Sequence, residues 1–85
     1  MNYPKIYADF HNADEQGRLR LNCIGTIEDL HRQHIQLHNG QNLTLPSENL
    51  EVNGLIQYSE NDQIWVAVID WNAIRAIEEI ATLVS

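Results

Sequence analysis

The sequence predicts a mainly β, α+β fold: a small antiparallel sheet, either strongly curved or closed into a partly open SH3-like barrel, with a short central helical turn and a C-terminal helix. Three observations predict this fold. Short segments alternate apolar and polar residues, which is the period of a half-buried strand. Clusters of glycine, asparagine and aspartate separate these segments, as turns require. The last segment instead repeats apolar residues every three or four positions, which is the period of a helix.

The first two strands are expected over residues 5–11 and 18–24. The first strand alternates apolar side chains at Ile6, Ala8 and Phe10. The second places two kinds of side chain on opposite faces, with Leu19, Leu21 and Cys23 on one and Arg18, Arg20 and Asn22 on the other. The polar, turn-rich stretch between the two segments predicts that they form an antiparallel hairpin.

Residues 25–33 fit two structures. Thr26 followed by Asp29 resembles a helix capping box, and Arg32 would suit the last turn of a helix. The apolar residues of this stretch would also fit a bent strand. We favour the first interpretation, which predicts one or two helical turns.

Residues 34–45 are expected to form a hairpin that turns at Asn39-Gly40. A loop of odd length collects four apolar side chains on one face: Ile35, Leu37, Leu43 and Leu45. A two-residue loop would separate them, so burial favours the odd-length loop. Pro46 is expected to end this strand, because proline has no N–H to donate to a ladder.

Another hairpin is expected over residues 50–70, turning near Glu60 and placing Tyr58 opposite Ile64. Its last strand is apolar at every position, which predicts burial on both faces. Gly54 would permit a bend or a bulge in the strand before it.

Asp70 is a suitable N-cap for a closing helix over residues 71–84. An apolar stripe runs along that helix at Ala73, Ile77, Ile80 and Val84. The stripe has to pack against the sheet or against a second subunit. The chain is thus expected to be a single domain, 1–85, with a β-rich core over 1–70 and the helix closing it.

Composition limits the function. Five basic residues face twelve acidic ones, for a net charge of −7. Nucleic-acid affinity comes largely from lysine and arginine contacts to phosphate, so this balance argues against nucleic acid as the partner. No apolar run is long enough to cross a membrane and no signal peptide is recognisable, which predicts a cytoplasmic location and no membrane partner. Cys23 is the sole cysteine, which excludes an internal disulfide.

The candidate binding residues are aromatic and basic. Aromatic side chains near a sheet edge or groove make good anchors for a protein partner, and arginines on an exposed strand face can pair with acidic groups of a neighbour. These arguments single out Trp65, Trp71, Tyr58, Arg18 and Arg20. Both tryptophans also fit a structural role, in which they pack the closing helix onto the sheet.

His31, His34 and His38 are the most suggestive cluster of metal-ligating type. Three imidazoles can hold zinc with one coordination position open. A break in the helix near residue 33 would separate His31 from the other two, which favours ordinary surface histidines. The sequence contains no phosphate-binding glycine loop, GxSxG or HExxH, and we expect no catalytic residue and no cofactor.

Four stretches resemble short, uncharacterised bacterial proteins, cyanobacterial ones among them: Tyr7-Ala8-Asp9-Phe10, Gly17-Arg18-Leu19-Arg20-Leu21, Gly25-Thr26-Ile27-Glu28-Asp29-Leu30 and Trp65-Val66-Ala67-Val68-Ile69-Asp70-Trp71. The resemblance covers most of the chain, to about Arg75, and is a match of hydrophobic pattern and glycines. It implies no activity, cofactor or catalytic residue.

The first functional hypothesis is a non-enzymatic protein-interaction module that acts as an accessory or regulatory subunit. Its acidic surface favours a basic protein partner, and the stripe around Ile77, Ile80 and Val84 suggests a homodimer. The alternative is a metal or small-ligand sensor that uses the three histidines. A second alternative is a small nucleic-acid-binding barrel, whose contacts would be Arg18, Arg20 and Tyr7.

Overall fold

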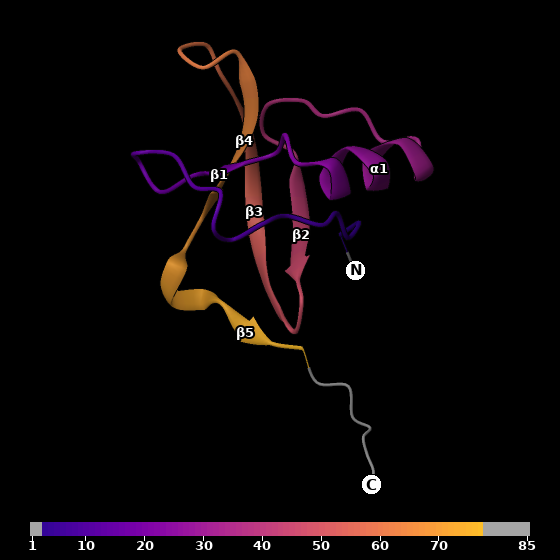
Figure 1. Cartoon of the computed structure of the whole chain (residues 1–85), viewed down its shortest axis with the longest axis vertical. Coiled ribbons are helices and arrows are strands. Elements are labelled where there is room, and N and C mark those ends of the chain that lie inside the picture. Colours follow the sequence, from indigo (N-terminus) through magenta and orange to yellow (C-terminus); the bar gives the residue numbers. More distant parts are fainter. Residues whose placement is uncertain (1–2, 78–85) are drawn as a thin grey trace, which may run out of the picture.

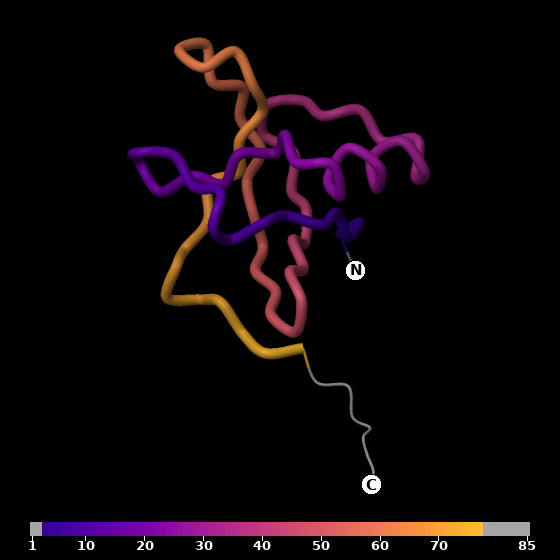
Figure 2. The backbone as a smooth tube through the Cα atoms, viewed as in Figure 1, coloured from indigo at the N-terminus to yellow at the C-terminus, as the bar shows by residue number. Residues whose placement is uncertain are grey.

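The computed structural model describes residues 3–77 and is a mainly antiparallel β-sheet with one α-helix beside it (Figure 1). The elements in chain order are β1 (Leu19–Arg20), α1 (Ile24–Arg32), β2 (Asn42–Ser47), β3 (Leu50–Ser59), β4 (Ile64–Ile69), the 3-10 helix η1 (Trp71–Ala73) and β5 (Arg75–Ala76). The strand order is β1-β4-β3-β2, and β5 pairs with β3. The trace places the β3–β4 turn and β5 at opposite ends of the molecule (Figure 2).

The predicted α+β class is confirmed, whereas the SH3-like closure is not seen in residues 3–77. The strand path is open, because β1 and β2 stand at its two ends and do not pair with each other. Segments without strand assignment extend both ends. Lys5 forms a parallel bridge with Thr44 of β2, and Ala13 forms an antiparallel bridge with Leu19 of β1.

The centre of the sheet is the antiparallel run β2–β3–β4. Leu43 and Leu45 of β2 lie opposite Gly54 and Val52 of β3. The predicted hairpin over residues 34–45 is therefore wrong, because the apolar side chains of β2 find their partners in the strand that follows. The turn between β2 and β3 passes through Glu48, whose φ is 57°.

Pro46 does not end a strand, contrary to expectation. It lies within β2, opposite Glu51 of β3. Its carbonyl accepts a hydrogen bond from the Ala8 N–H at 3.2 Å. A proline in a ladder loses its donor but keeps its acceptor, and here the N-terminal segment uses that acceptor.

The β3–β4 hairpin is confirmed with its turn at residues 60–63, but its register is one residue away from the prediction. Tyr58 lies opposite Trp65 rather than Ile64. Val66 and its neighbour Ala67 are both fully buried although they point to opposite faces. The apolar pattern of β4 therefore fits either register, and packing against β3 decides between them.

The N-terminal segment does not form the predicted hairpin with residues 18–24. The Ile6 N–H donates to the Thr44 carbonyl at 3.0 Å, which places this segment along β2. Leu19 of β1 instead lies opposite Ala67 of β4. The predicted burial is nevertheless confirmed, since Ile6 and Leu19 are fully buried. Alternation identifies the face that a strand buries, and it does not identify the strand's partner.

The helix α1 confirms the helical interpretation of residues 25–33, but the capping box is wrong. The N-cap is Cys23, and no side chain caps the helix there. Thr26 and Asp29 instead bind the backbone of Tyr7. The Thr26 hydroxyl donates to the Tyr7 carbonyl at 2.6 Å, and Asp29 Oδ2 accepts from the Tyr7 N–H at 2.8 Å. The Tyr7 N–H and carbonyl point away from β2, and the side chains of Thr26 and Asp29 provide their hydrogen-bond partners.

Replacing Thr26 with valine is expected to lower the free energy of unfolding by about 1–3 kcal/mol, because the fully buried side chain keeps its shape while the Tyr7 carbonyl loses its donor. Urea unfolding followed by circular dichroism measures the change. Thr44→Val is the matched control, since the Thr44 hydroxyl donates to a side chain, Asn53 Oδ1 at 3.1 Å, rather than to the backbone. Equal losses in the two variants would show that the contact to Tyr7 has no special role.

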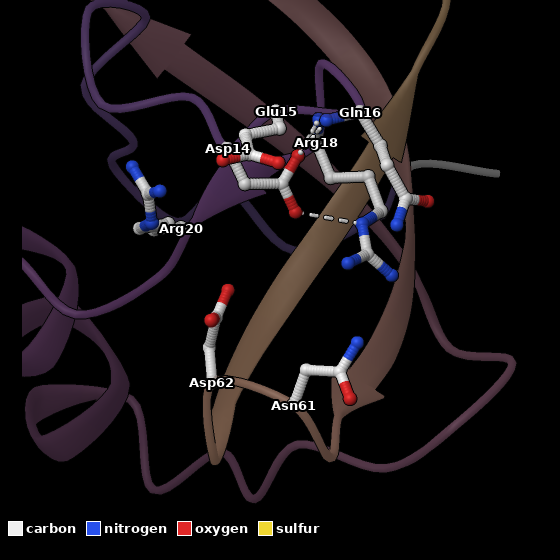
Figure 3. Close-up of a pocket in the computed structure, with 7 residues that line it drawn as sticks. All are labelled: Asp14, Glu15, Gln16, Arg18, Arg20, Asn61 and Asp62. Carbon is white, nitrogen blue, oxygen red and sulfur yellow. Dashed lines mark hydrogen bonds and ion pairs between the residues drawn. The ribbon is translucent and has the colours of Figure 1, made fainter.

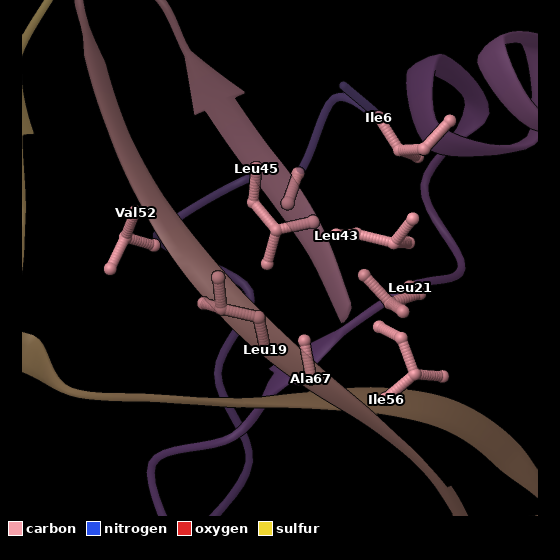
Figure 4. Packing of buried hydrophobic residues seen from close by; sticks show 9 residues of the cluster. Ile6, Leu19, Leu21, Leu43, Leu45, Val52, Ile56 and Ala67 are labelled. Carbon is pink, nitrogen blue, oxygen red and sulfur yellow. The ribbon is translucent and has the colours of Figure 1, made fainter. Parts of the chain in front are cut away.

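The core lies between the sheet and the N-terminal segment (Figure 4). Its buried residues are Ile6, Ala8, Leu19, Leu21, Leu43, Leu45, Val52, Ile56 and Ala67. Gly54 belongs to the same layer, and a Cβ there would lie 2.7 Å from Leu45 Cδ1 and 3.2 Å from Ala67 Cβ. Gly54 thus permits close packing of β2 and β4 on β3, where the sequence had suggested a bend.

The predicted closing helix is wrong over residues 71–77. Asp70 is the N-cap as expected, and its carboxylate accepts from the Asn72 N–H at 2.9 Å, but only the short η1 follows. The backbone is extended at Ile74, whose side chain packs against the core, and β5 then pairs with Leu50 and Glu51. Pairing with the free edge of β3 replaces the helix. The rest of the predicted helix, with Ile80 and Val84, lies outside the described residues.

Residues 3–77 contain no helix that is both long enough and apolar enough to span a membrane.

Candidate functional site

Tyr58 and Trp65, two predicted anchors, form an aromatic pair at one end of the β3–β4 hairpin. Their ring centroids lie 5.1 Å apart with an interplanar angle of 72°, which is an edge-to-face arrangement. Tyr58 is exposed and Trp65 is half-buried against the core. The pair stabilises its own hairpin and exposes mainly the tyrosine.

Trp71, the third anchor, holds the loop before β1. Its indole Nε1 donates to the Gly17 carbonyl at 2.8 Å, and its ring meets Phe10 edge-on at 6.5 Å. Gly17 has a φ of +81°, and a Cβ there would lie 3.2 Å from the indole nitrogen. These contacts agree with the structural role expected for Trp71, although Trp71 packs on this loop and not on a closing helix.

Arg18 and Arg20 come together at the same loop. Arg18 Nε donates to Asp14 Oδ2 at 2.8 Å, and the two side chains are 18% and 4% exposed. Arg20 Nη1 donates to the Ala13 carbonyl at 2.8 Å. Because Leu19 between them points into the core, both arginines lie on the opposite face of β1.

Asp14 is the organising residue of this loop. Besides the Arg18 guanidinium, its Oδ1 accepts from the backbone N–H groups of Arg18 at 2.8 Å and Gln16 at 2.9 Å. Burial raises the pKa of the Asp14 carboxyl, but the hydrogen bonds from Arg18 and Gln16 and the charge of Arg18 outweigh it. The pKa therefore lies below its ordinary value, and Asp14 is ionised at neutral pH.

A polar pocket of about 160 Å³ opens between this loop and the β3–β4 turn (Figure 3). The polar pocket is lined by Asp14, Glu15, Gln16, Arg18, Arg20, Asn61 and Asp62. It contains both arginines that the sequence singled out. It also contains Asp62, which the sequence analysis did not single out.

The histidines are exposed and only two of them share a surface. His31 is in the last turn of α1, and His34 follows the helix with a φ of 56°. Both line an open groove with Ile27, Leu30, Ile35 and Gln36. His38 lies in the loop before β2 and does not line this groove. Among residues 3–77, no three histidine, cysteine, aspartate or glutamate side chains are placed to hold a metal ion.

The groove continues onto an exposed apolar face of α1. Ile24 is 74% exposed and Ile27 is 52% exposed, although the core of this small protein lies just beneath the helix. The groove beside them has a volume of about 430 Å³. We call Ile24, Ile27 and the groove residues the α1 patch.

Sequence reasoning missed the α1 patch. The spacing of Ile24, Ile27 and His31 could have indicated it, because these residues share one face of a helix, on the side opposite Thr26. Tyr7, the proposed nucleic-acid contact, is half-buried, and its ring lies against Gly25, where a Cβ would be 2.8 Å from Tyr7 Cδ2. Tyr7 and the two arginines therefore do not form one surface.

No protein-family model, curated protein or solved structure matches this chain.

Proposed function

We propose that this chain is a non-enzymatic protein-interaction module whose α1 patch binds a basic protein surface. The exposure of Ile24 and Ile27 is the observation that supports this proposal most. Burying an isoleucine side chain stabilises by about 1.5–3 kcal/mol, so two exposed ones are a substantial part of the energy of a small interface. Large apolar groups at the centre of a contact, next to a groove, are typical of binding hot spots.

The covered edges of the sheet favour recognition through side chains. The N-terminal segment pairs with the outer edge of β2, residues 12–14 pair with β1, and α1 side chains bind Tyr7. A partner that added a strand would need a row of free N–H and C=O groups. In residues 3–77 the helix surface offers more to a partner than these edges do.

The charge of the chain defines the partner's chemistry. With a net charge of −7, the protein attracts a surface rich in lysine and arginine and repels an acidic one. Glu28 is exposed on α1 next to Ile27, so a negative charge lies beside the patch. A basic rim around an apolar centre is the complement of this surface.

Replacing Ile24 and Ile27 together with aspartate is expected to abolish binding of the basic partner. The test compares cross-linked complexes captured by the wild type and by the double variant, at low and at high salt, with mass spectrometry to identify the partner. We expect one stoichiometric basic protein that the wild type captures, that the variant loses and that high salt weakens. Both substituted residues are exposed, so the fold should persist, and circular dichroism checks it.

Val68→Asp is the matched control, because Val68 is an exposed apolar residue on β4 rather than on α1. It should capture the partner as the wild type does. Capture that the control loses and the α1 variant keeps would contradict the proposal. So would self-association measured by light scattering that depends on Ile27, because the occupant would then be a second copy of this chain.

A further inference from the structure

The polar pocket has opposite charges on its two sides. Figure 3 shows the Arg18 guanidinium and the Asp62 carboxylate facing the same hollow, with Asn61 beside Asp62. No ion pair within 4.0 Å joins Asp62 to either arginine in the described part of the chain. The pocket thus holds two complementary charges that are too far apart to neutralise each other directly.

Arg18 is held in place but keeps donors for a ligand. Its Nε and backbone N–H both bind Asp14, which fixes the guanidinium plane. Within residues 3–77, neither of its terminal nitrogens donates a hydrogen bond to the protein. A guanidinium with two parallel N–H groups free matches the two oxygens of a carboxylate.

Asp62 can serve the other end of a ligand. It lies in the β3–β4 turn, where its backbone N–H reaches Ser59 Oγ at 3.4 Å, and its side chain is exposed toward the hollow. An exposed carboxylate accepts hydrogen bonds from an ammonium group. The amide side chains of Gln16 and Asn61 add both donors and acceptors to the walls.

The sum of these charges excludes a simple ion as the best ligand. Asp62 and Glu15 repel a bare anion, while Arg18 and Arg20 repel a bare cation. The volume of about 160 Å³ is several times the roughly 10–15 Å³ that one water molecule needs by this measure, so the pocket has room for a small molecule. The charges on its two sides suit a small molecule with a negative and a positive end.

We propose that the polar pocket binds a small zwitterion of the α-amino-acid class. Its carboxylate lies on the guanidinium of Arg18, with Arg20 as the second cation, and its ammonium lies on Asp62. This site consists of residues other than those of the α1 patch, so it goes beyond the proposed function and can be tested without it.

The test is a titration of the full chain followed by amide NMR, with L-alanine, propionate and ethylammonium as probes. Propionate lacks the ammonium of alanine and ethylammonium lacks its carboxylate. We expect saturable shifts at Gln16, Arg18 and Asn61 with L-alanine at millimolar concentration. Each single-charge probe should bind about tenfold more weakly, since it forms only one of the two charged contacts.

Asp62→Asn should weaken L-alanine binding about tenfold. It should not weaken propionate binding, because the substitution removes a carboxylate that repels this anion. Glu60→Gln removes a carboxylate from the same turn without touching the pocket, so its affinities should equal those of the wild type. Equal binding of L-alanine and propionate would reduce the site to an oxyanion site and overturn the proposal. An absence of saturable shifts with L-alanine would also overturn it.

Discussion

Replacing Asp14 with alanine is expected to lower the free energy of unfolding by about 3 kcal/mol. The Asp14 side chain is 4% exposed and receives three hydrogen bonds, two from Arg18 and one from Gln16. Its removal leaves the largely buried Arg18 guanidinium without a counter-charge and two loop N–H groups without an acceptor. The loop before β1 should then open, and Trp71 should lose its contact with Gly17.

The loss should depend on pH in a defined direction. Burial raises the pKa of Asp14, but the hydrogen bonds and the charge of Arg18 lower it by more than burial raises it. The pKa of Asp14 in the folded state is therefore below the ordinary value of 3.8. Stabilisation by the carboxylate is then fully present above pH 3.8 and is lost as the pH falls through the folded-state pKa. The difference between wild type and variant should shrink in that acid range.

Urea unfolding at a series of pH values measures both effects. Glu15→Ala is the control, because Glu15 neighbours Asp14 in sequence but is exposed and receives no hydrogen bond from the described residues. It should change stability by less than about 0.5 kcal/mol. A variant of Asp14 as stable as the Glu15 control would show that the loop does not depend on this carboxylate.

Replacing Gly54 with valine is expected to destabilise the sheet by about 3 kcal/mol. Even the first carbon of the new side chain would lie 2.7 Å from Leu45 Cδ1, 3.2 Å from Ala67 Cβ and 3.4 Å from Ile69 Cγ2. Leu45 and Ala67 are fully buried, so they have little room to move. Strands β2 and β4 would have to separate from β3. Thermal unfolding followed by circular dichroism provides the measurement.

Leu55→Val is the control on the same strand, since Leu55 is 39% exposed and tolerates a smaller side chain. A second comparison uses Gly54→Ala with and without Leu45→Val, which withdraws the nearest atom. The two changes should couple favourably by about 1 kcal/mol, because the shorter side chain makes space for the new methyl. Strict additivity would show that contact with Leu45 is not what limits residue 54.

Local patterns identified the buried faces and one hairpin. Alternation placed Ile6 and Leu19 in the core, and polar residues marked the β3–β4 turn. Partners and registers were harder to predict, because they depend on segments far away in the sequence. Leu19 pairs with Ala67, and a strand as uniformly apolar as β4 fits two registers equally well.

Strong local signals also failed where the sheet competed with them. Asn39-Gly40 does form a turn, with a φ of +86° at Gly40, but the residues before it form no strand because β2 pairs with β3. Asp70 does cap a helix, yet η1 ends after Ala73, and Ile74 and β5 follow the edge of β3. A capping residue starts a helix, and tertiary pairing decides how far it continues.

The candidate sites depended on the same distant contacts. The arginines of the polar pocket could be chosen from sequence, but Asp62 meets them only because β1 pairs with β4. The exposure of Ile24 and Ile27 depends on which side of α1 faces inward. The hydrogen bonds between the Tyr7 backbone and the side chains of Thr26, which donates, and Asp29, which accepts, decide that side. No property of the helix sequence alone specifies Tyr7 as their partner.

The N-terminal segment and β1 are synthesised before the strands with which they pair. The bridge from Lys5 needs Thr44 of β2, and β1 needs Ala67 of β4, so the N-terminal segment has no strand to join until β2 has been made, and β1 has none until β4 has been made. Until its own partner strand exists, neither Ile6 nor Leu19 has that strand to pack against. During much of its synthesis the nascent chain therefore exposes apolar residues that the folded chain buries, and Leu19 can be buried against the sheet only after β4 has been made.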